Sequence, residues 1–148
     1  MKYDDASWHY EGDFPEHLPP EAGATHIGMF LAWLLLHGLP SEELREDAAD
    51  ELAALEARRI TGVQFLRQVL DEKLLANDLD DTGNAFAVAY YQGKDDDSRY
   101  FDDYLRVFDG QESLYHVEDN WANYDRLAEL IDERFAAWND QGRPQYIL

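Results

Sequence analysis

The stretch from Glu21 to His37 constrains the fold more than any other part of the sequence. Pro20 suits the first turn of a helix, and Gly38 with Pro40 suits its end. Apolar side chains occur on almost every side of that helix: Ile27, Met29, Phe30, Leu31, Trp33, Leu34, Leu35 and Leu36. A helix that is apolar all round must be covered by other elements. The sequence therefore predicts a fold built around one central, buried helix.

Helical periodicity and capping residues predict further helices around this centre. Ser41 is a good N-cap, and Thr61 with Gln64 has the spacing of a capping box. The predicted helices cover residues 41–59, 61–74, 84–92, 95–108 and 120–139. Short strands are expected at residues 7–10 and 112–118. We expect a mainly α protein, a compact bundle of about five or six helices with one or two short strands.

The first 20 residues differ from the rest in composition. They hold the aromatic residues Trp8, Tyr10 and Phe14 together with three prolines. Because prolines force an extended or turning path, we expect an ordered arm packed on the helical body. No repeat or linker divides the 148 residues, so residues 1–148 are predicted to form a single acidic helical domain.

The charge of the chain narrows the classes of function. Asp and Glu number 32 against 12 Lys and Arg, which gives a net charge of −20. Direct nucleic-acid binding needs clustered Lys and Arg, and the nearest approach to a cluster is Arg58-Arg59. An acidic surface instead suits a basic protein partner, or serves only to keep the protein soluble.

Targeting and catalytic motifs are absent. The first residues lack the basic and apolar regions of a signal peptide, and the longest apolar stretch, His26 to Leu39, is too short to span a membrane. We therefore expect a cytoplasmic protein that does not bind membranes. The chain has no cysteine and no known nucleophile or phosphate-binding motif, so no catalytic residue, metal site or cofactor is assigned.

An acidic and aromatic segment is the first candidate binding region. A partner-binding surface is predicted from its carboxylates and aromatic rings, which are Asp95, Asp96, Asp97, Tyr100, Asp102, Asp103 and Tyr104. Aromatic anchors provide contact area, and negative charge steers a basic partner. The alternative is that the acidic residues only cap the start of a helix.

The arm carries the second candidate, a ligand-binding or acid–base site. Trp8, His9, Glu11 and Asp13 lie within six residues of one another. His9 with Glu11 or Asp13 could form an acid–base pair or part of a metal site, for which further ligands would come from His17 or His26. The alternative is that the arm is only pinned to the core.

Two other patterns are assigned structural roles. His26 and His37 are eleven residues apart, roughly 16 Å along a helix, so each is expected to be packed and hydrogen-bonded. The loop from Asp78 to Gly83 resembles the start of an EF-hand, but position 12 is Ala89 instead of a glutamate. We expect a helix-capping loop there, with Asp81 or Thr82 as the cap.

Several blocks of the sequence resemble an uncharacterised family of small acidic bacterial proteins. The blocks are residues 2–9, 13–15, 21–30, 83–87 and 117–124. Such proteins are similar to cytoplasmic immunity proteins, which bind and block secreted toxins. The resemblance implies a protein that neutralises a basic toxin by occluding it.

Two other functions stay open at the level of the sequence. One is a small enzyme or a metal- or ligand-binding protein that uses the arm around His9 and the helix carrying His26. It predicts a concave pocket where these histidines and a carboxylate converge. The other is a nucleic-acid mimic with carboxylates spaced like phosphates.

Overall fold

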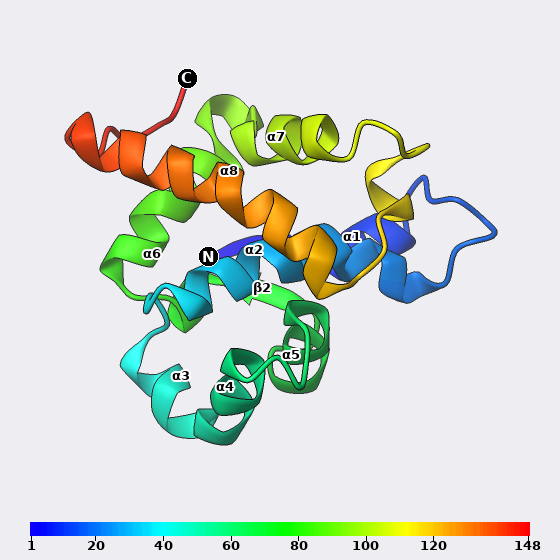
Figure 1. Cartoon of the computed structure of the whole chain (residues 1–148), viewed down its shortest axis with the longest axis horizontal. Coiled ribbons are helices and arrows are strands. Elements are labelled where there is room, and N and C mark those ends of the chain that lie inside the picture. Colours follow the sequence, from blue (N-terminus) through cyan, green and yellow to red (C-terminus); the bar gives the residue numbers. More distant parts are fainter.

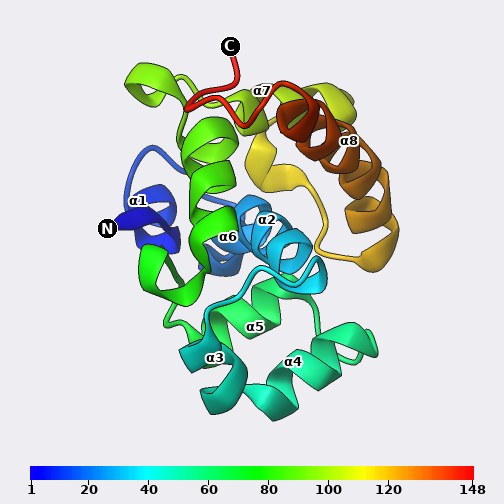
Figure 2. The ribbon, with the colours of Figure 1, turned by 90° about the vertical axis from the view of Figure 1, so that its left-hand side faces the viewer.

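Helix α2 (Thr25–Leu36) runs through the middle of the computed structural model, which describes residues 1–148. Eleven of its twelve residues are buried, as expected for a helix that is apolar on every side. Figures 1 and 2 show α3, α4 and α5 on one side of α2, and α7 and α8 on the other. The prediction of a mainly α protein is confirmed, with eight α-helices instead of five or six.

The predicted boundaries of the central helix need one adjustment. Residues Pro20–Ala24 form a 3-10 turn, η1, and the α-helix proper begins at Thr25. Pro20 lies in the first turn of η1, as its fixed φ favours.

The layer below α2 contains α3 (Glu42–Asp47), α4 (Ala49–Glu56) and α5 (Gly62–Val69). The single helix predicted over 41–59 is wrong, because the backbone at Ala48 (φ −123°, ψ 32°) breaks it in two. The helix predicted over 61–74 ends early. Asp71 and Glu72 adopt positive φ after it, and Lys73–Leu75 form a strand, β2.

A pair of glycines allows α2 and α5 to touch through their backbones. A Cβ atom added at Gly62 would lie 1.9 Å from the carbonyl oxygen of Gly28, and one at Gly28 would lie 2.6 Å from the nitrogen of Val63. Only residues without a side chain fit at this crossing. The capping box predicted for Thr61 and Gln64 is present at the start of α5.

The remaining helices complete the fold. The 3-10 turn η2 (Ala76–Asp78) leads into α6 (Asp81–Phe86), which continues as a π-helical segment, η3 (Ala87–Gln92). The turn η4 (Lys94–Asp96) precedes α7 (Arg99–Val107), and η5 (Leu114–His116) precedes α8 (Trp121–Asp140). The long last helix matches its prediction to within a residue at each end.

The only sheet has two short antiparallel strands, β1 (Lys2–Asp5) and β2. Asp4 pairs with Leu74 and Asp5 pairs with Lys73, and the register is irregular between Lys2 and Asp4. The strands predicted at 7–10 and 112–118 are wrong. Residues Ala6–Tyr10 form the short helix α1, which Asp5 caps, and 114–116 form η5.

One cluster of 33 buried apolar residues, from Ala6 to Trp138, forms the core. A buried carboxylate pins α7 to α8 at its edge: Asp103 accepts two hydrogen bonds from Arg134, at 2.8 and 2.9 Å. Tyr90 donates a third, at 2.7 Å. None of the helices combines the length and the apolar character needed to cross a membrane.

Candidate functional site

Three side chains from separate elements converge at the edge of the core. Nε2 of His9 lies 2.8 Å from Oδ1 of Asp4 and 3.2 Å from Nε2 of His26. Nε2 of His26 lies 3.4 Å from Oδ2 of Asp4. We call Asp4, His9 and His26 the convergent triad. It brings one carboxylate and two imidazoles within contact distance of one another.

The strand β1 positions the carboxylate. Asp4 and Asp5 are consecutive, yet both are buried, at 4% and 5% exposure. The two carboxylates have different partners, since Asp4 contacts His9 and His26 whereas Asp5 accepts hydrogen bonds from Lys2 and Ser7. Asp5 then caps α1 by accepting a hydrogen bond from the nitrogen of Ser7 at 2.9 Å. The chain thereby turns from strand to helix directly before His9.

The two histidines come from different helices. His9 lies on α1, and its Nδ1 is 2.7 Å from the hydroxyl of Tyr115. His26 lies in the first turn of α2 and is fully buried. Its Nδ1 has no hydrogen-bond partner, so packing holds the ring, with Phe101 at 5.2 Å and Tyr104 at 6.2 Å between ring centroids. Only His9 of the two is partly exposed, at 14% of its side chain.

Buried tyrosines support the triad. Tyr91 donates a hydrogen bond to Oδ2 of Asp4, and Tyr100 donates one to the backbone carbonyl of His26. Burial raises the pKa of both tyrosines well above its ordinary value, so both hydroxyls keep their protons and act as donors. The backbone nitrogen of Asp5 also donates to Oδ1 of Asp4, at 2.8 Å.

The protonation states follow from burial and hydrogen bonding. Burial favours the protonated form of Asp4, but hydrogen bonds with His26 and His9 outweigh it and hold the pKa of Asp4 well below its ordinary value. Burial lowers the pKa of His26 despite the nearby carboxylate. At neutral pH the triad therefore contains an ionised carboxylate and a neutral buried imidazole.

The triad opens onto a cleft of about 470 Å³. Asp4 and His9 lie in its wall, and His26 lies behind them. The other lining residues are Lys2, Tyr3, Trp8, Tyr91, Gln92, Asp96, Ser98 and Phe101. Trp8 is 55% exposed, and Asp95 and Asp96 both have positive φ, an unfavourable conformation for a residue with a side chain. A small molecule or a peptide side chain could reach the triad from this side.

The sequence prediction for the arm is correct in part. The structure brings His9 and His26 together and places Trp8 in the same cleft. Glu11 and Asp13 are exposed and form no hydrogen bond or ion pair with His9, so the predicted acid–base partners are wrong. The carboxylate is Asp4, which sequence reasoning missed. Its only signal was its place five residues before His9 in a stretch expected to pack on the body.

The predicted acidic and aromatic surface needs a correction. Asp95, Asp96, Asp97 and Asp102 are exposed. The other three predicted residues are buried in the core, at 0–2% exposure: Tyr100, Asp103 and Tyr104. Their helix, α7, presents its aromatic face inward, so they cannot anchor a partner on the surface. Of the aromatic residues in the two candidate sets, only Trp8 is well exposed.

The remaining sequence motifs have structural roles. Nδ1 of His37 lies 2.7 Å from the carbonyl of Trp33, and its Nε2 lies 3.1 Å from Asp132, as expected for a packed histidine. His26 is likewise packed, fully buried and in contact with a carboxylate, that of Asp4. The loop before α6 is a capping loop as predicted, but Asp80 is the cap instead of Asp81 or Thr82.

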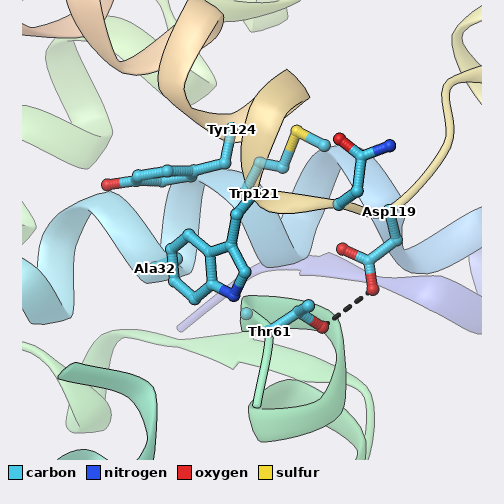
Figure 3. A pocket seen from close by; sticks show the side chains of 8 residues that line it. Ala32, Thr61, Asp119, Trp121 and Tyr124 are labelled. Carbon is cyan, nitrogen blue, oxygen red and sulfur yellow. Dashed lines mark hydrogen bonds between the residues drawn. The ribbon is translucent and has the colours of Figure 1, made fainter. Parts of the chain in front are cut away.

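A second contact between α2, α5 and α8 is filled by side chains. Figure 3 shows Trp121 beside Ala32 and Thr61, with a hydrogen bond from Thr61 to Asp119 at 2.8 Å. The space left between these residues is about 10 Å³, the size of roughly one water. Burial raises the pKa of Asp119. This region joins helices and offers no room for a ligand.

Comparison with known proteins identifies the family of the chain. The family model of a domain of unknown function, DUF7832, matches residues 2–117. The chain belongs to the DUF7832 family. The matched region contains all three residues of the triad, together with Tyr91 and Tyr115, whereas the whole of α8 lies outside it. No curated protein and no solved structure matches the chain.

Proposed function

We propose that the protein binds a divalent transition-metal ion through the convergent triad, and that the bound ion acts on a ligand held in the adjoining cleft. The observation that carries this proposal is the contact of the two oxygens of one carboxylate with two imidazole nitrogens that lie 3.2 Å apart: Oδ1 of Asp4 contacts His9, and Oδ2 contacts His26.

The distances within the triad suit a coordination sphere. Ligand atoms about 2.1 Å from one ion, at the angles of an octahedral or tetrahedral site, lie about 3.0–3.4 Å apart. In the triad the two imidazole nitrogens lie 3.2 Å apart, Nε2 of His9 lies 2.8 Å from Oδ1 of Asp4, and Nε2 of His26 lies 3.4 Å from Oδ2. Hydrogen bonds from the two histidines explain their contacts with Asp4, but they leave the 3.2 Å contact between the two Nε2 atoms unexplained, because two N–H groups that both donate to Asp4 do not bond to each other.

The protonation of the triad also suits a metal ion. A ligand must offer a lone pair, which an ionised carboxylate and a neutral imidazole both do. The Tyr115 hydroxyl beside Nδ1 of His9 and the Tyr91 hydroxyl on Asp4 are the outer hydrogen bonds that commonly orient metal ligands. Two histidines and one carboxylate favour an ion such as Zn²⁺ or Fe²⁺ and leave coordination positions open.

The cleft supplies a place for the ligand of the bound ion. His9 is both a triad member and a cleft residue, so an open coordination position on its side would face the cleft. Such an ion acts as a Lewis acid or activates a bound water. Trp8 and Phe101 would contact the apolar part of the ligand, and Gln92 and Ser98 offer hydrogen bonds.

Zinc titration by calorimetry tests the proposal. We expect His26→Asn to weaken zinc binding at the triad at least about 100-fold, since one of three protein ligands is lost. Asp4→Asn, which keeps the size of the side chain, should have a similar effect. His37→Gln is the matched control, because His37 also lies on the central helical segment but outside the triad.

The control variant must bind zinc like the unchanged protein. Circular dichroism and thermal unfolding establish that each variant is folded. Should zinc bind equally well to folded His26→Asn and Asp4→Asn, or not bind to the unchanged protein at all, the proposal is wrong.

We also keep the immunity-type function as a second proposal, in which the protein binds and occludes a basic toxin domain. One observation supports it beyond the net charge and the family resemblance. The exposed carboxylate of Asp96 lines the same cleft as the exposed ring of Trp8, so an aromatic anchor lies beside negative charge. The partner would then insert a basic side chain into the cleft.

A further inference from the structure

We propose that His17, Glu112 and His116 form a second metal site, which fastens the loop of residues 11–19 to the segment before α8. We call these three residues the clasp. They share no ligand with the convergent triad, so this inference is independent of the function proposed above.

The clasp joins two segments that are far apart in sequence. Nε2 of His17 lies 3.0 Å from Nε2 of His116, and Nε2 of His116 lies 3.2 Å from a carboxylate oxygen of Glu112. All three ligand atoms lie within 4.8 Å of one another. Figure 1 shows the loop after α1 (blue) beside the yellow segment that leads to α8. Two imidazoles and a carboxylate thus meet at the surface.

The local structure prepares His116 as a ligand. Ser113 caps η5, since its Oγ accepts a hydrogen bond from the nitrogen of Tyr115 at 3.2 Å. The same Oγ lies 2.8 Å from Nδ1 of His116. With a proton on Nδ1 directed at Ser113, the lone pair of Nε2 points toward His17 and Glu112. His116 is only 15% exposed, so its ring is held in this orientation.

The two other ligands are exposed, which distinguishes the clasp from the triad. Glu112 is 80% exposed, and His17 is also exposed. Water can therefore complete the coordination sphere of an ion at the clasp. Ordering two exposed side chains costs conformational entropy, so we expect weaker binding than at the buried triad.

The loop has few other attachments to the body. Its backbone hydrogen bonds are local, such as that from Leu18 to Pro15 at 3.2 Å. Besides the clasp, Phe14 of the loop packs on Tyr115, with 4.8 Å between ring centroids. Tyr115 in turn contacts His9 of the triad. An ion at the clasp would thus hold the loop closed and steady the tyrosine that orients His9.

Proteolysis of the loop measures this fastening. A glutamate-specific protease can cut after Glu16, which is exposed and adjacent to His17. At a zinc concentration ten times the Kd of the clasp, the open form of the loop falls about tenfold. We expect zinc to slow cleavage after Glu16 about tenfold in the unchanged protein, as followed by mass spectrometry.

Two variants separate the clasp from the triad. In His17→Ala, whose side chain is exposed, zinc should no longer slow cleavage after Glu16, and calorimetry should lose the weaker binding event only. In His26→Asn the protection should persist, because the clasp is intact. Each variant is compared with and without zinc, so a change in the basal cleavage rate does not enter the result.

The inference is overturned if zinc leaves cleavage of the unchanged protein unaltered, or slows it equally in His17→Ala. It is also overturned if protection disappears in folded His26→Asn but persists in His17→Ala, since the triad alone would then control the loop.

Discussion

At the scale of single residues, the site depends on contacts that span the chain. His9 was identified from residue type in a suggestive segment and His26 as a further ligand from the central helix, and the structure brings the two together. Asp4 was missed because its position follows from the pairing of β1 with β2, about 70 residues away, and local patterns do not reveal such a pairing. The contact of His9 with Tyr115 joins residues 106 positions apart, which local patterns cannot reveal.

Asp119 provides a test of burial at the same scale. Its pKa is raised above the ordinary value of 3.8, mainly by burial. A carboxyl whose pKa is raised on folding stabilises the fold below its unfolded pKa, and this contribution is lost as the pH rises through the folded pKa. The ionised form is thus unfavourable at neutral pH, although Thr61 donates a hydrogen bond to it.

We therefore expect Asp119→Asn to be at least as stable as the unchanged protein at pH 7. As the pH falls toward about 4, the free energy of unfolding of the unchanged protein should rise relative to that of the variant. Urea unfolding at several pH values measures this difference. Glu118→Gln, an exposed neighbour, controls for the removal of one negative charge. A difference between Asp119→Asn and the unchanged protein that does not vary with pH would contradict the assignment.

At the scale of elements, periodicity predicted the long helices well and their interruptions poorly. The apolar spacing of α8 and the apolar surface of α2 are strong signals, and both helices occur where expected. The break at Ala48 and the turn at Asp71 and Glu72 have no such signal, because non-glycine residues there adopt unusual backbone angles. Strand β2 was missed because its tertiary pairing with β1 overrides the helical pattern of its sequence.

The crossing of α2 and α5 gives a prediction about packing. We expect Gly62→Ala to lower the free energy of unfolding by about 2 kcal/mol or more, because the new Cβ would overlap the carbonyl of Gly28 and force the helices apart. Chemical denaturation measures the change. Gly110→Ala is the control, since no atom lies within 4 Å of the added Cβ there. An equal effect of the two substitutions would show that close backbone approach is not what selects glycine at position 62.

At the scale of the whole molecule, the net charge of −20 attracts cations and basic proteins and repels anions. Only part of the predicted acidic segment can attract a partner at the surface, because Asp103 is neutralised by Arg134 inside the fold. The exposed carboxylates around the cleft still favour a cation or a basic protein at its rim. The same field would raise the local concentration of metal ions near the triad.

The immunity-type proposal makes a prediction at this scale. Affinity purification from the native host should recover a basic protein, and its association rate should fall steeply as salt increases, because exposed charges are screened within about 8–10 Å. Trp8→Ala should weaken the complex by at least about 2 kcal/mol if Trp8 is an anchor. Surface plasmon resonance measures both effects.

An exposed residue that does not line the cleft, Leu105, provides the matched control as Leu105→Ala. Recovery of no partner, or a complex that is insensitive to salt and to Trp8→Ala, would count against this function.

The short sheet also fixes the order of events when the protein is made. The carboxylate of Asp4 acquires its direction only when β1 pairs with β2, so a ribosome must first have released residues up to Leu75. Tyr115, whose hydroxyl contacts the ring of His9, is synthesised only some forty residues after Leu75. Because such distant pairings form slowly, the residues at the very beginning of translation are among the last to find their places. A half-made chain would carry the ligands for an ion without the geometry to hold it.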